Sequence, residues 1–144
     1  MPDTNTDTGT LTLERDLPHP PQKVWRALTE SHLIAEWLLP NDFKAEPGHA
    51  FTLRAPPMPQ WDGVVDGHVV EVTPYDRLSY RWELPGGGLH TLVTLTLTPT
   101  PQGTRLHVTQ SGFTAEQGHN LRGANYGWQN FLKQLEEVVA RSDV

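Results

Sequence analysis

The sequence predicts an α+β fold in which a curved antiparallel sheet of about six or seven strands wraps around one long C-terminal helix. Short segments of alternating apolar and polar residues fill most of residues 11–110, and this period of two is typical of half-buried strands. Two short stretches of helical period interrupt them after the first strand. After residue 121 the period changes to that of an amphipathic helix.

The first strand is expected over residues 11–17, where Leu11, Leu13 and Leu17 alternate with polar residues. Prolines at positions 18, 20 and 21 end this strand. Pro21 suits the first turn of a helix, because the N–H that proline lacks has no partner there. The apolar spacing then predicts helices over 21–29 and 31–38, and Pro40 ends the second one.

The central region reads as a series of strands joined by tight turns. Strands are expected over 43–45, 50–54, 63–73, 77–82, 91–98 and 104–110, with proline and glycine between most of them. A last helix of about 17 residues from Ala124 would be roughly 25 Å long, which is enough to cross a sheet. Its apolar face includes Trp128, Leu132 and Leu135.

Composition limits the classes of partner. The 144 residues include 17 acidic and 11 basic ones, for a net charge of −6, which argues against a nucleic-acid partner. No cysteine is present, so disulfides and thiolate-bound metals are excluded. No stretch has the roughly 18 apolar residues of a membrane span. We expect residues 1–9 to be a flexible tail, residues 10–144 to be one domain, and the location to be cytoplasmic.

Motifs spread over about residues 10 to 140 resemble one family. They are Pro20 to Thr29 (PPQKVWRALT), Glu36-Trp37-Leu38, Glu46-Pro47-Gly48 with Phe51, Gly67 with Val69 to Val72, Arg77-Leu78 with Trp82, Gly103 to Leu106, Gln110 to Phe113, and Gly127-Trp128 with Leu132 to Leu135. Together they are similar to the activator of heat-shock-protein ATPase homologues, within the START-like (SRPBCC) superfamily. That resemblance implies the helix-grip fold of the birch-allergen type, with an apolar cavity between the long helix and the sheet.

Three functions remain open from the sequence. The first is binding of a small hydrophobic or aromatic molecule, lipid-like or polyketide-like, in that cavity without catalysis. The second, which the family name implies, is a co-chaperone-like module that regulates a heat-shock-protein ATPase. The third is a cyclase-like enzyme that uses histidine and tyrosine side chains of the cavity. No cofactor is expected, and the protein could be a monomer or a homodimer.

The candidate cavity residues are mostly aromatic. Rings can form an apolar wall, and the N–H of tryptophan or O–H of tyrosine can orient a ligand. The aromatic candidates are Trp37, Phe43, Phe51, Trp61, Tyr80, Trp82 and Trp128. Packing in an ordinary core is the alternative for each of them.

The charged candidates are three strand histidines and one arginine. His68, His90 and His107 could point inward as proton carriers, or outward to solvent. The seven histidines show no metal-ligand spacing, so no metal site is predicted. Arg15 falls on the leucine face of its strand, where it could pair with an acidic residue of a neighbouring strand or meet a ligand carboxylate. It could equally lie at the rim of the sheet, with its aliphatic stem carrying the charge to water.

The segment from Gly112 to Tyr126 is rich in glycine and asparagine. It reads either as a long connection into the last helix or as a mobile gate at one end of the cavity. Gly112, Phe113, Gly118 and Gly123 are the candidate gate residues.

Overall fold

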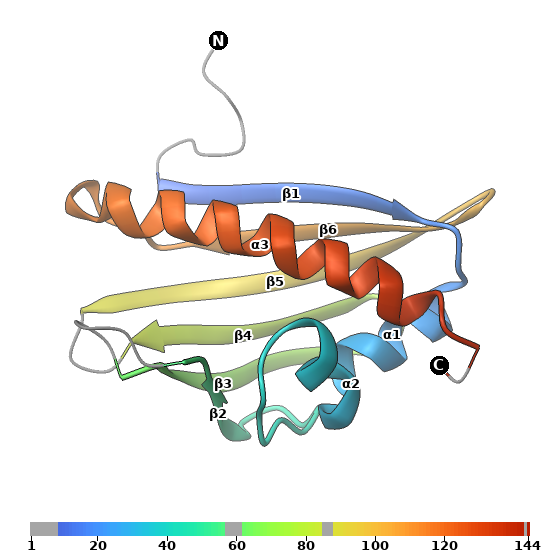
Figure 1. Ribbon diagram of the computed structural model, residues 1–144, viewed down its shortest axis with the longest axis horizontal. Coiled ribbons are helices and arrows are strands. Elements are labelled where there is room, and N and C mark those ends of the chain that lie inside the picture. The colour runs from blue at the N-terminus through green and yellow to red at the C-terminus, as the bar shows by residue number, and fades with distance from the viewer. Residues whose placement is uncertain (1–8, 57–61, 85–87, 143) are drawn as a thin grey trace, which may run out of the picture.

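An antiparallel sheet of six strands, with one long helix lying across one of its faces, forms the framework of the molecule (Figure 1). The computed structural model describes residues 9–56, 62–84, 88–142 and 144. The long helix α3 runs diagonally over the sheet, and two short helices lie beside the C-terminal half of α3. These features are those of the helix-grip fold, as the sequence predicted.

The elements follow the chain in a simple order. They are β1 (Thr10–Leu17), α1 (Pro21–Thr29), α2 (Ser31–Trp37), β2 (Ala50–Arg54), β3 (Val64–Thr73), β4 (Arg77–Leu84), β5 (Leu89–Thr100), β6 (Gly103–Ser111), the 3₁₀ turn η2 (Ala115–Gln117) and α3 (Gly118–Val139). In the sheet the strand order is β1-β6-β5-β4-β3-β2. Strands β2 to β6 therefore form a meander, and β1 pairs with the last strand of the meander.

The strand expected at residues 43–45 is not formed. Asn41 instead makes an isolated bridge with Leu53 on β2. The Asn41 side chain bends the chain here: its Oδ1 accepts the Phe43 N–H, and its Nδ2 donates to the carbonyl oxygens of Leu39 and Ser31. These side-chain bonds compete with a strand ladder, so Phe43 follows an irregular segment into the core.

The last helix begins earlier than the spacing of apolar residues indicated. It starts at Gly118 and has 22 residues, about 33 Å at 1.5 Å per residue. The turn before it is closed at both ends, because Thr114 N–H donates to Gln117 Oε1 and Gln117 N–H donates to Thr114 O. The expectation of a long connection up to Tyr126 was therefore wrong, since Gly118 and Gly123 are helical and do not break the helix.

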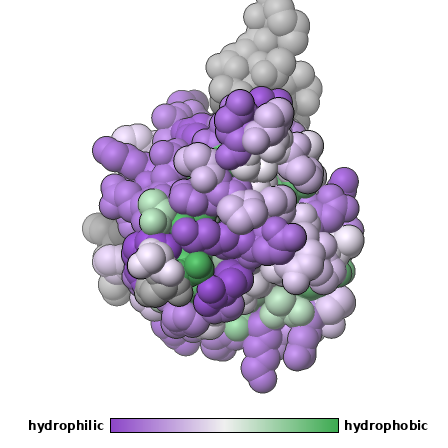
Figure 2. Space-filling model, turned by 90° about the vertical axis from the view of Figure 1, so that its right-hand side faces the viewer, coloured by the Kyte–Doolittle hydropathy of each residue, from purple (hydrophilic) through white to green (hydrophobic). Residues whose placement is uncertain are grey.

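The core lies between α3 and the sheet. Leucine and valine side chains of β1, β5 and β6 meet the apolar face of α3, which buries Trp128, Leu132, Leu135, Val138 and Val139. The end of the molecule that carries the C-terminus is covered mainly by hydrophilic residues, with hydrophobic colour confined to small separate patches (Figure 2). No helix within the described residues is both long enough and apolar enough to cross a membrane.

Gly67 on β3 allows a close contact with the edge strand. A Cβ atom placed there would lie 2.3 Å from the ring of Phe51, which is itself 4% exposed. We expect Gly67→Ala to lower the free energy of unfolding by about 1–3 kcal/mol, because the packed ring cannot move away without cost. Urea denaturation measures this change.

A matched control is Gly123→Ala on α3. A Cβ at Gly123 meets nothing within 4 Å, so the substitution should raise stability by about 0.5–1 kcal/mol through helix propensity. Adding Phe51→Leu to Gly67→Ala should recover part of the loss. Unchanged stability in Gly67→Ala would show that Phe51 does not constrain this position.

Candidate functional site

A chain of three buried hydrogen bonds connects α3 to the middle of the sheet. Trp128 Nε1 on α3 donates to Gln110 Oε1 on β6 at 2.9 Å, and Gln110 Nε2 donates to Thr91 Oγ1 on β5 at 2.9 Å. Thr91 Oγ1 donates in turn to the carbonyl oxygen of Trp82 on β4 at 2.7 Å. Trp128, Gln110 and Thr91 are each at most 1% exposed. The chain therefore fixes the position of the helix over three strands without leaving a buried polar atom unpaired.

Aromatic rings surround this chain. The Trp128 ring centroid lies 6.4 Å from that of Trp37, 6.0 Å from that of Trp82 and 5.9 Å from that of Phe131. Trp37 Nε1 donates to the carbonyl oxygen of Ala27 at 2.7 Å. Of the tryptophans that the structure describes, the two that are 1% exposed, Trp37 and Trp128, thus both have their indole N–H bonded within the protein. Neither has the free donor that the sequence analysis assigned to the cavity tryptophans.

A second aromatic group fills the interior next to β2. The rings of Phe43, Phe51 and Tyr80 lie edge to face, with centroids 5.0 to 6.0 Å apart. All three residues are buried, and burial raises the pKa of the Tyr80 hydroxyl well above its usual range. These rings pack against one another, so we interpret this group as core.

Apolar side chains at the N-terminal half of α3 and the end of β4 are only half-buried. Trp82 and Leu84 on β4 share a strand face, and Leu121, Ala124 and Phe131 share the helix face of Trp128. All five pack against the core but keep some exposure to solvent. We call this set the α3–β4 apolar surface.

The three strand histidines lie on the opposite side of the sheet. His68 and His90 are exposed, His107 is half-buried, and each is out of phase with the buried residues of its strand. Tyr80 faces the core, so these histidines do not meet Tyr80 as the cyclase-like alternative would require. Strand alternation decides this, because neighbours such as Val69, Leu89 and Val108 take the inward positions.

Arg15 lies on the leucine face of β1, as alternation predicted, but its partner is on the helix. Its Nε atom is 3.8 Å from Glu136 Oε2 on α3, and its Nη1 donates to Glu14 O. Both Arg15 and Glu136 keep access to solvent, so this pair lies at the rim between β1 and α3. We interpret Arg15 as an interface residue of the fold.

The expected gate residues fall in two elements. Gly112, with φ +110°, and buried Phe113 follow β6, whereas Gly118 and Gly123 lie within α3. The structure thus divides them between a short connection and a regular helix. Trp61, the remaining aromatic candidate, lies outside the described residues.

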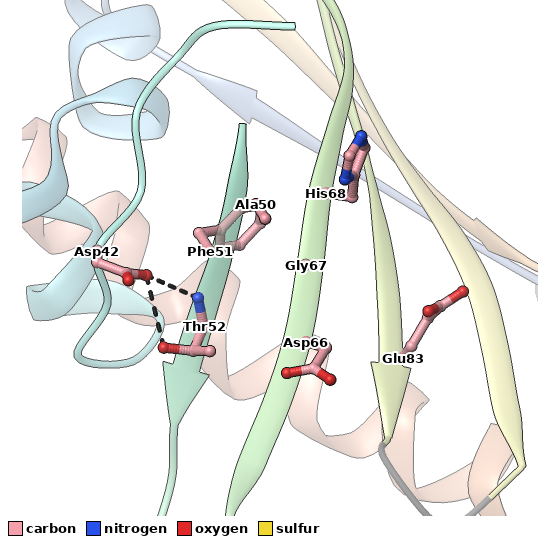
Figure 3. A pocket seen from close by; sticks show the side chains of 8 residues that line it. All are labelled: Asp42, Ala50, Phe51, Thr52, Asp66, Gly67, His68 and Glu83. Carbon is pink, nitrogen blue, oxygen red and sulfur yellow. Dashed lines mark hydrogen bonds between the residues drawn. The ribbon is translucent and has the colours of Figure 1, made fainter. Parts of the chain in front are cut away.

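A pocket of about 420 Å³ opens at the β2–β4 edge of the sheet (Figure 3). Asp42, Ala50, Phe51, Thr52, Asp66, Gly67, His68 and Glu83 line it. Asp42 Oδ1 accepts the Thr52 N–H at 2.6 Å, which satisfies a donor on the open edge of β2. Within the described part of the chain, no three acidic, histidine or cysteine side chains are arranged to hold a metal ion. We interpret this pocket as polar surface of the sheet edge.

Comparison with known proteins identifies the family. The model for "Activator of Hsp90 ATPase homolog 1-like protein" matches residues 18–140. The chain belongs to this family. A search of curated proteins finds no match.

Solved structures of other proteins with this fold are closely similar to the structure of this chain. Protein MLL2253 from Mesorhizobium loti is 46% identical, with a TM-score of 0.87 over 94% of this chain and 99% of that one. Protein CV1439 from Chromobacterium violaceum is 27% identical, with a TM-score of 0.78 over 93% of this chain and 99% of that one. DynU16, a protein in the dynemicin biosynthetic locus, is 26% identical, with a TM-score of 0.78 over 90% of this chain and 46% of that chain.

The buried polar residues Gln110 and Thr91 were not among the site residues predicted from the sequence of this Activator of Hsp90 ATPase homolog 1-like domain. Gln110 is in phase with Leu106 and Val108, and Thr91 is in phase with Val93, so alternation places both polar side chains inward. A polar residue at an inward strand position needs a partner. That signal was present, but it names no partner, because Trp128 lies 18 residues further along, on a helix whose position over the sheet the sequence does not give.

The outer face of the sheet carries a titratable pair that can be tested. The hydrogen bond from His90, followed by that from Arg81, holds the pKa of Glu83 below its ordinary value of 4.5. Because the folded-state pKa is lowered, ionised Glu83 adds stability above its ordinary pKa, and this is lost as the pH falls through the lowered value. We expect His90→Ala to raise the pKa of Glu83 in an NMR titration.

His107→Ala is the control for this titration, since His107 lies near Glu14 on the far strands. It should leave the pKa of Glu83 unchanged. A lowered Glu83 pKa that persists in His90→Ala would assign the effect to Arg81 instead.

Proposed function

We propose that this protein binds a small hydrophobic or aromatic molecule at the α3–β4 apolar surface, without catalysing its conversion. The observation that carries the proposal is the partial exposure of Trp82, Leu84 and Phe131 on the inner side of the fold. Apolar groups on the inner side of a helix–sheet layer are normally buried, because each Å² removed from water stabilises by about 25 cal/mol. A bound apolar molecule would complete that burial.

The aromatic rings of the α3–β4 apolar surface are held in fixed positions. Trp82 and Phe131 each contact the fixed ring of Trp128, so their planes present edges and faces at set angles. Rigid rings of this kind bind flat or branched apolar molecules with little loss of side-chain entropy. The relative from the dynemicin biosynthetic locus supports a ligand drawn from the small molecules of such a locus.

The absence of catalysis is part of the proposal. The inward polar side chains Gln110 and Thr91 already use their hydrogen-bonding atoms within the protein. His68, His90 and His107 lie on the outer face, away from Trp82. The described residues near the α3–β4 apolar surface therefore offer shape and hydrophobic contact, and no general acid or base placed for a reaction.

The family description supports a second candidate, in which the domain regulates a heat-shock-protein ATPase. This function needs a protein contact, and it predicts a change in the ATP turnover of the Hsp90-type chaperone from the same organism when the purified domain is added. Unchanged turnover at saturating domain concentration would exclude this second candidate.

Filling the proposed site with a side chain tests the first candidate. Ala124 is half-buried on the helix face of Trp128, so Ala124→Trp places an indole where the ligand would lie. Binding of uncharged N-phenyl-1-naphthylamine is followed by energy transfer from tryptophan. We expect Ala124→Trp to weaken it at least tenfold, because the apolar surface is already covered.

Tyr126→Trp is the matched control. It adds the same ring two residues along α3, where the side chain is 73% exposed. This variant should bind the probe as the unmodified protein does. Equal binding by Ala124→Trp and Tyr126→Trp would contradict the location, and no binding by the unmodified protein would contradict the function.

A further inference from the structure

We propose that the open edge of β1 is a dimerisation surface, where a second copy of this chain adds its own β1 antiparallel to this one and joins the two sheets. The occupant is a second copy because the side chains of β1 complement one another when the strand is paired with itself end for end. The inference stands apart from the proposed function, since no residue of the α3–β4 apolar surface lies on β1.

The two edges of the sheet differ in how their backbone is covered. β1 lies along one margin and β2 along the other (Figure 1). β2 has only five residues, and Asp42 Oδ1 accepts its Thr52 N–H at 2.6 Å. The carbonyl oxygen of Pro40 accepts the Arg54 N–H at 3.0 Å. An edge that is short and covered in this way resists pairing with another strand.

The β1 edge lacks this protection within the part of the chain that the structure describes. Its eight residues pair with β6 without a bulge, and they include neither proline nor lysine. An antiparallel strand directs the backbone groups of every second residue away from its neighbour. From Thr10 to Asp16, the one backbone hydrogen bond outside the ladder with β6 among the described residues runs from Arg15 Nη1 to the carbonyl oxygen of Glu14. The edge therefore offers N–H and C=O groups to a further strand.

The outer-face side chains of β1 change character along the strand. Thr10 and Thr12 carry hydroxyl groups, whereas the carboxylates of Glu14 and Asp16 are 59% and 68% exposed. A parallel partner in register would place carboxylate beside carboxylate. An antiparallel partner with the two-fold axis at Leu13 instead places Thr12 opposite Glu14 of the second copy. Thr10 then lies opposite Asp16, so hydroxyl donors face carboxylate acceptors on both sides of the axis.

The inner-face side chains fit the same register. Leu13, which is 7% exposed, meets Leu13 of the second copy at the axis, and Leu11 meets the aliphatic stem of Arg15. An axis at Glu14 would set two carboxylates opposite each other. The axis at Leu13 avoids this contact, and it leaves Arg15 beside Glu136 at the rim.

Analytical ultracentrifugation tests the surface. An interface built on one strand from each copy is small, so we expect a monomer–dimer equilibrium with a dissociation constant of about 10–100 μM. Thr12→Glu places carboxylates opposite each other on both sides of the axis, and it should raise that constant about tenfold or more. Thr94→Glu is the control on the outer face of β5. It should leave the constant within about twofold, because its added charge lies two strands from β1 and is screened.

Thr12→Lys tests the direction of pairing. Lysine on an edge strand normally opposes association. In the antiparallel register, however, the new ammonium group faces Glu14 of the second copy on both sides of the axis. Thr12→Lys should therefore lower the dissociation constant by about threefold or more, and Thr94→Lys should not.

A monomer at every concentration up to about 1 mM overturns the proposal. So does a dimer that Thr12→Glu and Thr94→Glu weaken equally, and a dimer that Thr12→Lys weakens overturns the antiparallel pairing. If the Thr12 variants fail to fold, amide hydrogen exchange of the unmodified protein decides the location. Exchange at the β1 amides that face away from β6 should slow as the protein concentration rises through the dissociation constant, and unchanged exchange there contradicts the proposal.

Discussion

The hydrogen bonds from Trp128 through Gln110 to Thr91 are the constraint on which the rest of the structure depends. A helix can slide or rotate on an apolar sheet at small cost, because hydrophobic contact is not directional. Three buried polar groups on α3, β6 and β5 have no alternative partners, so any such movement would break bonds that water cannot replace. This constraint fixes the Trp128 ring, and through it the positions of Trp82 and Phe131.

The same constraint divides the interior into two parts. Next to β2, the rings of Phe43, Phe51 and Tyr80 pack on one another and over Gly67, which leaves a solid core. Between the end of β4 and α3, the side chains of Trp82, Leu84 and Phe131 pack against the core but are only half-buried. On the outer face of the sheet, Glu83 pairs with Arg81 and with His90. The protein thus keeps its ionic groups away from its accessible apolar surface.

The sequence was sufficient to predict the architecture, because the spacing of apolar residues that distinguishes a strand from a helix is local. Alternation predicted β1, β4, β5 and β6 and placed Arg15 on the leucine face, and the helical period predicted α3 from Ala124 onward. The prediction from the sequence was wrong where neighbouring residues give opposite signals about whether a helix forms. Glycines at positions 118 and 123 resemble helix breakers, yet Thr114 and Gln117 start the helix before them. The sequence also did not predict which side chains pair between α3 and the sheet: Arg15 with Glu136, and Gln110 with Trp128, meet only because α3 lies on the sheet.

Binding of an apolar molecule at the α3–β4 apolar surface, beside Trp82, can be followed through the tryptophans themselves. The indole N–H resonances of the ¹⁵N-labelled protein can be followed by NMR while N-phenyl-1-naphthylamine is added. We expect the resonances of Trp82 and Trp128 to shift with one common affinity. That of Trp25, which packs against Tyr75 on the turn between β3 and β4, should stay in place. A shift of Trp25 with no movement of Trp82 or Trp128 would contradict the account.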